Sequence, residues 1–175
     1  MTQPMTWTGK LRRIMRHRWL DESDTRRIVP PDLLERLAQR VAASEKRHSG
    51  EVRIYVEAGL PMSYLLRNAT PRQRAIAMFG KLRVWDTEHN NGVLVYLLIA
   101  ERAIEIVADR GLNDRVPATE WQAIVDRMRN AFRESHYEDG LTHALEEVSA
   151  LLVQHFPLAA GETNPNELPD EPVLG

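Results

Sequence analysis

Two polar clusters bracket the most apolar part of the chain, and their residue types are those that bind metal ions and phosphate. The first cluster contains Asp86, Asn90 and Asn91, and the second contains Asp109 and Arg110. Carboxylate and amide oxygens suit hard divalent cations such as Ca²⁺ or Mg²⁺. A guanidinium beside backbone N–H groups suits a phosphate. Whether these residues form one site depends on whether the fold brings the two clusters together.

The two clusters lie at the outer ends of two predicted strands. Residues 92–100 are apolar on both faces, which is typical of a central strand that is covered on each side. Residues 102–109 follow at once as a second strand. Parallel pairing needs a long crossover, and only Glu101 and its neighbours separate these two runs. The sequence therefore predicts an antiparallel hairpin.

The register of this hairpin decides which polar residues meet. A turn centred on Ala100–Glu101 places Asn91 and Gly92 opposite Asp109 and Arg110, on strands about 4.8 Å apart. The helix that precedes the first strand ends at Asp86, the acid of the first cluster. The predicted metal ligands are Asp86, Asn90, Asn91 and Asp109, and the predicted phosphate-binding residue is Arg110.

The same residues also suit ordinary loop chemistry. Asn90, Asn91 and Gly92 favour a turn with positive φ before the strand, and Asp109 with Gly111 favours an exit turn. In open parallel sheets, ligands usually lie beyond the C-terminal ends of the strands. This cluster lies at the opposite end of the first strand. An ion site, a phosphate site and a pair of structural turns are therefore three open interpretations.

No nucleophile motif accompanies the polar clusters. The sequence has no G-x-S-x-G, Walker-type or G-x-G-x-x-G segment, and it contains no cysteine for thiolate chemistry or for a zinc site built on cysteine. His136, Asp139 and His143 contain metal-ligand residue types. Gly140, however, is expected to interrupt the helix between the two histidines. Enzymatic activity stays open, with a weak phosphatase as the candidate.

The order of the predicted elements indicates the fold class. The segment 51–59 alternates as a half-exposed strand, with Arg53, Tyr55 and Glu57 on the outer face. A strand, a crossover helix and a second strand form a right-handed parallel unit. The prediction is an α/β fold with a small mixed β-sheet, made of a parallel βαβ unit plus an antiparallel hairpin strand and sandwiched by helices over 30–50, 70–86, 117–132 and 140–156.

The two ends of the chain differ in charge. The predicted organisation is a basic N-terminal segment, an α/β domain and an acidic Pro-rich tail, over residues 1–29, 30–156 and 157–175. Residues 7–20 predict a short basic helix, either docked through Leu11, Ile14 and Met15 or in contact with anionic lipid or a partner. The tail composition favours a mobile segment or one that lies on the body through Leu168, Val173 and Leu174.

Composition restricts the compartment and the partners. The formal net charge is −2, which gives no global basic field for nucleic acid. The longest apolar run is far shorter than the roughly 20 residues of a membrane-spanning helix. The N-terminus lacks the apolar core of a secretory signal. We therefore expect a soluble, cytoplasmic protein without a transmembrane segment.

Several motifs of the chain resemble the TPM domain family, which is named for a thylakoid lumen protein, a photosystem II assembly factor and a worm receptor modulator. They are SGEVRIYVE, RAIAMFGKLRVWDTEHNNGVLVYLLIAERAIEIVADRGL, Trp121 and YEDGL, within residues 31–156. Asn-Asn-Gly followed by Asp-Arg-Gly is the most specific part. The ending NELPDEPVLG is similar to the tail of a small bacterial branch.

The resemblance implies a compact α/β sandwich, divalent-metal binding and acid phosphatase activity, as described for plant lumenal relatives. It also implies a membrane-anchored, LemA-like protein partner. We favour a non-catalytic interaction or quality-control module that is linked to the assembly or turnover of membrane-associated proteins. The alternative is a metal-assisted phosphomonoesterase in which Arg110 orients the phosphate and the ligands are Asp86, Asn90 and Asp109.

Overall fold

A computed structural model describes residues 7–20 and 22–175, and it is built around a four-stranded mixed β-sheet. Strand β1 pairs in parallel with β2 on one side and β4 on the other, and β3 pairs antiparallel with β2. The predicted fold class is therefore confirmed. In the order β3-β2-β1-β4, the strands span Ala103–Ala108, Val93–Leu98, Val52–Glu57 and Val173–Leu174.

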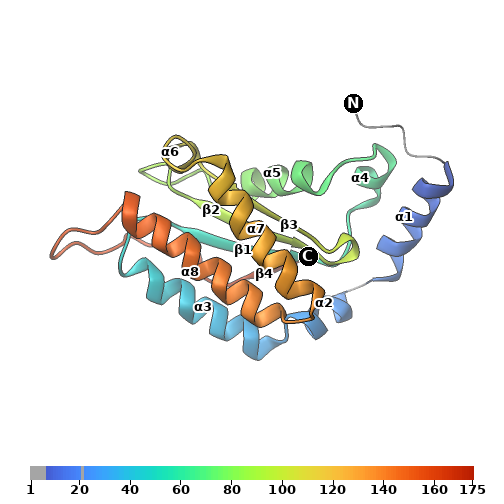
Figure 1. The fold of residues 1–175 in the computed structure, drawn as a ribbon, viewed down its shortest axis with the longest axis horizontal. Helices are drawn as coiled ribbons and strands as arrows, with labels where there is room; N and C mark the ends of the chain where they lie inside the picture. The colour runs from blue at the N-terminus through green and yellow to red at the C-terminus, as the bar shows by residue number, and fades with distance from the viewer. Residues whose placement is uncertain (1–6, 21) are drawn as a thin grey trace.

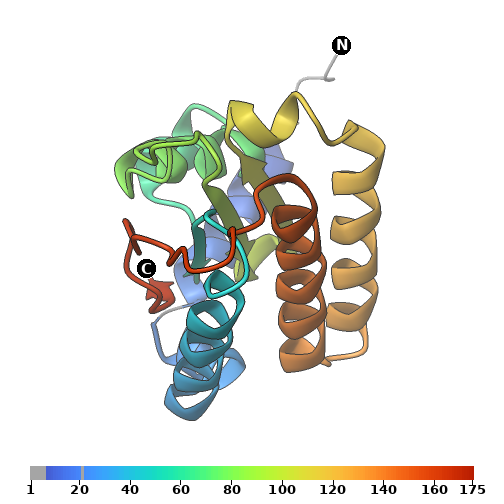
Figure 2. The same cartoon turned by 90° about the vertical axis from the view of Figure 1, so that its left-hand side faces the viewer.

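Helices cover both faces of the sheet (Figures 1 and 2). Helices α3, α7 and α8 pack on one face, and α4 and α5 pack on the other. Helix α1 lies beside α4 at one end of the molecule, whereas α6 lies at the far end (Figure 1). The helices are α1 (Trp7–Trp19), α2 (Glu22–Ile28), α3 (Pro31–Glu45), α4 (Met62–Leu66), α5 (Pro71–Lys81), α6 (Arg110–Asn113), α7 (Ala118–Arg133) and α8 (Tyr137–His155), with a 3₁₀ turn over Ile99–Glu101.

Local sequence signals explain where α5 begins. The Thr70 hydroxyl accepts from the backbone N–H of Gln73 at 3.2 Å, and the Gln73 side chain accepts from the backbone N–H of Thr70 at 2.9 Å. This reciprocal capping box satisfies two N–H groups that a helix start leaves free. The buried face of the helix is formed by Ala75 and Met78. Ile76 lies outside that face, because it is 52% exposed.

Strand β1 is buried on both faces, so the prediction of a half-exposed strand is wrong. Arg53, Tyr55 and Glu57 are 6%, 6% and 3% exposed. Alternation separates polar from apolar side chains, but it does not show what covers the polar face. Here Glu57 pairs with Arg74 of α5, and Arg53 donates to the Pro169 carbonyl of the tail. Buried polar groups of this kind are stable only when they have partners.

Helix α8 begins earlier than the sequence indicates. Gly140 lies inside the helix rather than interrupting it, and it is buried. A Cβ there would approach Phe132 Cε1 to 2.7 Å, so glycine lets α8 pack closely on α7. Tertiary packing thus outweighs the low helix propensity of this residue.

The tail over residues 157–175 packs on the sheet. Its last strand, β4, pairs with Tyr55 and Val56 of β1, and Leu168 is 8% exposed in the second core. Upstream of β4, the Glu51 carboxylate accepts from the backbone N–H groups of Glu167 and Leu168, each at 3.1 Å. Of the two predictions for the tail, the second is therefore confirmed: the tail lies on the body through Leu168, Val173 and Leu174.

Candidate functional site

The antiparallel pairing of β2 and β3 brings the two predicted polar clusters together. Its register ends with Val93 opposite Ala108, which matches the predicted turn centre at Ala100–Glu101. Beyond that pair, the backbone N–H of Asp109 donates to the Gly92 carbonyl at 2.9 Å. The loop before β2 and the loop after β3 are therefore in direct contact.

Arg110 is held by the first cluster through its side chain. Its Nε donates to Asn90 Oδ1 at 3.0 Å, and the backbone N–H of Gly111 donates to the Asn90 carbonyl at 3.0 Å. Asn90 has φ of +51°, as expected of a turn residue. A Cβ at Gly111 would lie 2.5 Å from the Asn90 carbonyl oxygen, so this close approach requires glycine. Arg110 is exposed, which keeps its guanidinium accessible to an anion.

Asn91 and Asp109 each have one buried side-chain oxygen without a partner. Asn91 is 0% exposed, and its Nδ2 donates to Ser49 Oγ at 3.2 Å. Asp109 caps α6, since its Oδ1 accepts from the backbone N–H of Arg110 at 2.7 Å. Asn91 Oδ1 and Asp109 Oδ2 accept no hydrogen bond from any described residue. Such oxygens are the donors that Ca²⁺ and Mg²⁺ prefer.

Asp86 is engaged elsewhere in the first loop. Its carboxylate forms an ion pair with Arg83, and its backbone N–H donates to the Arg83 carbonyl at 2.9 Å. Within residues 7–20 and 22–175, no three or more His, Cys, Asp or Glu side chains are arranged to hold a metal ion. The two unpaired oxygens have suitable chemistry for a hard cation, but they supply only part of its roughly six to eight oxygen ligands.

A buried ion pair occupies the C-terminal end of β1. The Glu57 carboxylate accepts from Arg74 Nε at 3.0 Å and from Arg74 NH2 at 2.5 Å. The hydroxyl of Tyr96 donates to the same carboxylate at 2.8 Å, and burial raises the pKa of this phenol. With its acceptor sites used in this way, Glu57 has a structural role. No pattern in the sequence marks this pair, because 16 residues separate its two members on different elements.

The inner side of α1 is fixed to the body by a second ionic cluster. Arg13 Nε donates to Glu101 at 2.6 Å, and His17 Nε2 lies 2.8 Å from the same carboxylate oxygen. The backbone N–H of Leu60 donates to His17 Nδ1 at 2.9 Å. Nδ1 therefore acts as the acceptor, so the ring proton resides on Nε2 and points to Glu101. A further bond from Lys10 Nζ reaches the Leu66 carbonyl at 2.7 Å.

The outer side of α1 carries four large apolar residues at intervals of four. Trp7, Leu11, Met15 and Trp19 are 78%, 46%, 49% and 83% exposed. Residues four apart share one helix face, so these side chains form one stripe, called the α1 stripe below. Of the three residues in the docking prediction, Ile14 packs on the second core, whereas Leu11 and Met15 are about half exposed. The ionic cluster and Ile14 thus attach one side of α1, and the stripe faces outward. The i, i+4 spacing of the two tryptophans with Leu11 and Met15 is the sequence signal of the stripe.

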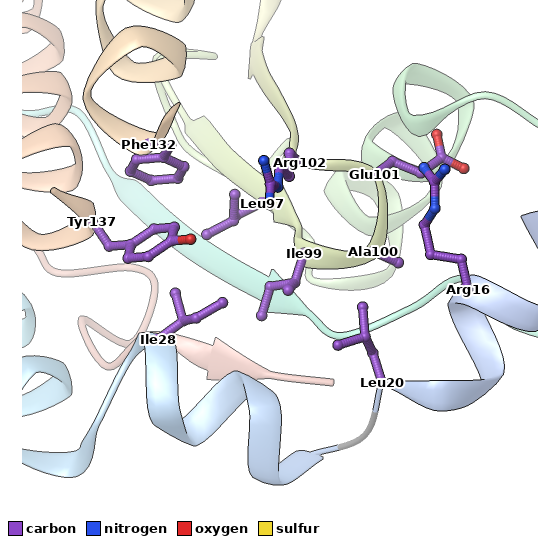
Figure 3. Close-up of a pocket in the computed structure, with 10 residues that line it drawn as sticks. All are labelled: Arg16, Leu20, Ile28, Leu97, Ile99, Ala100, Glu101, Arg102, Phe132 and Tyr137. Atoms are coloured by element: carbon purple, nitrogen blue, oxygen red, sulfur yellow. The ribbon is translucent and has the colours of Figure 1, made fainter. Parts of the chain in front are cut away.

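A cavity of about 540 Å³ opens between α1 and α2 on one side and α7 and α8 on the other (Figure 3). It lies beyond the C-terminal end of β2, opposite the polar loops. That end of a parallel pair is where α/β sheets usually bind ligands. No sequence pattern marks this cavity, because its lining comes from five separate segments: Arg16, Leu20, Ile28, Leu97, Ile99, Ala100, Glu101, Arg102, Phe132 and Tyr137.

A mixed four-stranded sheet between helices, with paired polar loops at the base of its hairpin, defines an α/β sandwich of the TPM type. The family model of the TPM domain matches residues 23–151, so the chain belongs to the TPM domain family. Among curated proteins, none matches the chain. Among the described residues, no helix is both long and apolar enough to cross a membrane.

Several solved structures share this fold, among them two bacterial proteins. The BA42 protein of the psychrophilic bacterium Bizionia argentinensis has 24% sequence identity and a TM-score of 0.71, over 82% of this chain and 93% of that one. The N-terminal domain of a protein from P. gingivalis has 20% identity and a TM-score of 0.61, over 75% of this chain and 83% of that one. At these identities the similarity shows the fold alone.

Proposed function

We propose that the protein is a non-catalytic interaction module that assists the assembly or turnover of membrane-associated proteins. The α1 stripe is the observation that carries this proposal. Arg13 and His17 fix the inner side of the helix, so its apolar side stays directed outward. Large contiguous exposed apolar surfaces are typical of interaction sites. A membrane-anchored, LemA-like protein fits this description as a partner.

The charges on α1 indicate where the module works. Arg12, Arg16 and Arg18 are exposed and carry three positive charges beside the stripe. Each arginine near an anionic lipid surface contributes about 1 kcal/mol of attraction, and tryptophan side chains prefer the interface between water and lipid. Anionic lipids are enriched in the cytoplasmic leaflet. We therefore assign the module to the cytoplasmic face of a membrane, where α1 lies flat on the surface next to the partner.

Retention by membranes tests this proposal. Purified protein is mixed with membrane fractions and, separately, with vesicles of phosphatidylcholine alone or with one third phosphatidylserine, and bound protein is sedimented. The double variant Trp7→Ser, Trp19→Ser is expected to lose at least about tenfold in retention, because two interfacial anchors are removed. Trp85→Ser is the matched control, since Trp85 is 50% exposed outside α1. Equal retention of both variants and the wild-type protein contradicts the proposal.

A second candidate function is a divalent-metal-assisted phosphomonoesterase at the polar loops. The two unpaired buried oxygens, Asn91 Oδ1 and Asp109 Oδ2, favour it. A bound ion would neutralise charge on the phosphoryl oxygens, with Arg110 orienting the phosphate and Asn90 holding Arg110 in place. Asp86 would add a carboxylate ligand by leaving Arg83.

Metal titration and turnover test this second candidate. Calorimetry with Ca²⁺ and Mg²⁺ measures binding, and a generic aryl phosphate measures turnover. Both are expected to collapse in Asp86→Ala and Asp109→Ala. Asp114→Ala is the control, because Asp114 is exposed at the end of α6. Turnover that is unchanged in the first two variants rejects a metal-assisted reaction here.

A further inference from the structure

We propose that the cavity beyond the end of β2 binds a small anionic amphiphile, namely a carboxylate with an aliphatic or aromatic body. The site is separate from the α1 stripe and from the polar loops. Its volume of about 540 Å³ lies within the roughly 300–1,000 Å³ of small-molecule pockets. Three features of the lining identify the ligand class.

The interior of the cavity is apolar. Leu97 of β2 and Phe132 of α7 are 2% and 5% exposed, and they belong to the main hydrophobic core. The ring of Tyr137 lies 5.0 Å from that of Phe132, centroid to centroid, and Figure 3 shows it between Phe132 and Ile28. A ligand body that contacts these side chains must be apolar, because the apolar wall offers a polar body no partner for its hydrogen bonds.

The rim of the cavity carries two uncommitted cations. Arg16 and Arg102 both line it (Figure 3), and the guanidinium of neither forms an ion pair or hydrogen bond with another described residue. The one acid of the lining, Glu101, is already bound by Arg13 and His17. The rim therefore has net positive charge. Guanidinium groups bind carboxylates through paired, charge-assisted hydrogen bonds.

The backbone of Arg102 supports a functional role for its position. Its φ and ψ are 50° and 37°, in the left-handed region that glycine or asparagine usually occupies in a turn. An arginine is less favourable there than glycine, and such backbone strain concentrates at ligand sites. The turn holds the guanidinium-bearing residue at the mouth of the cavity (Figure 3).

Decanoate is the probe, at concentrations below its micelle threshold, with decanol and decyltrimethylammonium as neutral and cationic counterparts. Calorimetry is expected to show saturable one-to-one binding of decanoate, with weaker binding of decanol and none of the cation. Chemical-shift changes in NMR spectra should centre on Leu97, Ile99 and Tyr137. Non-saturable binding, equal binding of the cation, or shifts confined to other residues overturns the proposal.

Substitution of the rim arginines distinguishes binding in this cavity from non-specific binding of the amphiphile. Arg16→Gln and Arg102→Gln should each weaken decanoate binding about tenfold or more, the worth of one charge-assisted contact. Arg102→Gly should do the same while it removes the backbone strain, so a loss in this variant does not reflect unfolding. Arg133→Gln is the control, because Arg133 is exposed on α7 and outside the lining. Equal affinity in all four variants contradicts the assignment.

The α1 stripe variant distinguishes this inference from the proposed function. Trp7→Ser, Trp19→Ser should bind decanoate as the wild-type protein does, since neither tryptophan lines the cavity. Loss of decanoate binding in this variant would mean that the amphiphile binds the stripe, which overturns the cavity assignment. Weakened decanoate binding with normal membrane retention in Arg102→Gly would support the cavity as an independent site.

Discussion

The two terminal regions of the described chain are both attached to the body of the protein, yet they direct their apolar side chains in opposite ways. In α1, Leu11 is 46% exposed and Trp19 is 83% exposed. In the tail, Leu168 is 8% exposed, and Val173–Leu174 form a strand of the sheet. The difference lies in which side of the segment is attached. A helix held through its polar side leaves its apolar side available to a partner, whereas a tail that buries its apolar side has little left to offer.

The carboxyl groups beneath the two terminal regions also differ in the direction of their pKa shifts. Burial raises the pKa of Glu101 under α1, but hydrogen bonds from His17 and Arg13 outweigh burial, so its pKa is lowered overall. Under the tail, burial raises the pKa of Glu45 to about 9, and repulsion from Glu51 adds to the shift. The attachment of α1 therefore uses an ionised carboxylate, whereas the packing of the tail favours a protonated one.

The largest effect is expected from the apolar anchor of the tail. Leu168→Ala should lower the free energy of unfolding by about 3 kcal/mol, because it removes a buried side chain and leaves a cavity. Urea denaturation followed by circular dichroism measures the loss. A loss below about 1 kcal/mol would mean that the tail does not contribute to the core, and the contrast with α1 would fail.

A smaller effect is expected from the ionic anchor of α1. Glu101→Gln should cost about 2 kcal/mol at neutral pH, the worth of a charge-assisted hydrogen bond that Arg13 and His17 lose. Because the folded pKa of Glu101 is lowered, its contribution is present above the unfolded value of 4.5 and is lost as pH falls through the folded value.

Paired urea titrations at neutral and acid pH check this sign. The difference between the wild-type protein and Glu101→Gln should shrink in acid. Glu120→Gln, exposed on α7, is the control and should show little difference at either pH. A difference that grows in acid would show that Glu101 is not held as a carboxylate.

The parts of the fold that the sequence predicts are those that local chain geometry decides. The short connection around Ala100–Glu101 permits only a hairpin, so the contact between Gly92 and Asp109 follows from register. The cap at Thr70 is also a local signal. The burial of Arg53 and Glu57 is not local, since it depends on the tail and on α5. The two-residue strand β4 also has no signal in the sequence, because it is short and lies in a Pro-rich segment.

The candidate site likewise contains contacts that the sequence predicts and contacts that it does not. The meeting of Asn90 with Arg110 could be predicted, because both flank one hairpin. The engagement of Asp86 by Arg83 could not, because it depends on the conformation of Arg83, whose φ is +56°. The outward orientation of the α1 stripe depends on Glu101, which is more than 80 residues away in sequence. Long-range ion pairs carry no periodic signal.

A third effect, opposite in sign, is expected beneath the tail. Glu45→Gln should stabilise the protein by about 1 kcal/mol at pH 8, the usual scale of a favourable single substitution. The folded pKa of Glu45 is raised, so the contribution of this one group to stability is most favourable at low pH and declines as pH rises from 4.5 toward about 9. The glutamine variant escapes that decline. Urea titrations at pH 5 and pH 8 should show a gain that increases with pH, and a gain that is larger at pH 5 would contradict it.

The smallest effect on the free energy of unfolding is expected in the α1 stripe, where substitution should have a large effect on vesicle binding. Leu11→Ala should change the free energy of unfolding by no more than about 0.5 kcal/mol, because the side chain is half exposed on the outer face of α1. The same variant should weaken retention on anionic vesicles, since it removes apolar area from the middle of the stripe. Leu168→Ala, measured under conditions where it stays folded, should retain vesicle binding. Leu11 thus serves membrane binding, whereas Leu168 serves the stability of the core. A Leu11→Ala variant that loses stability but keeps vesicle binding would show that this face of α1 packs against the body.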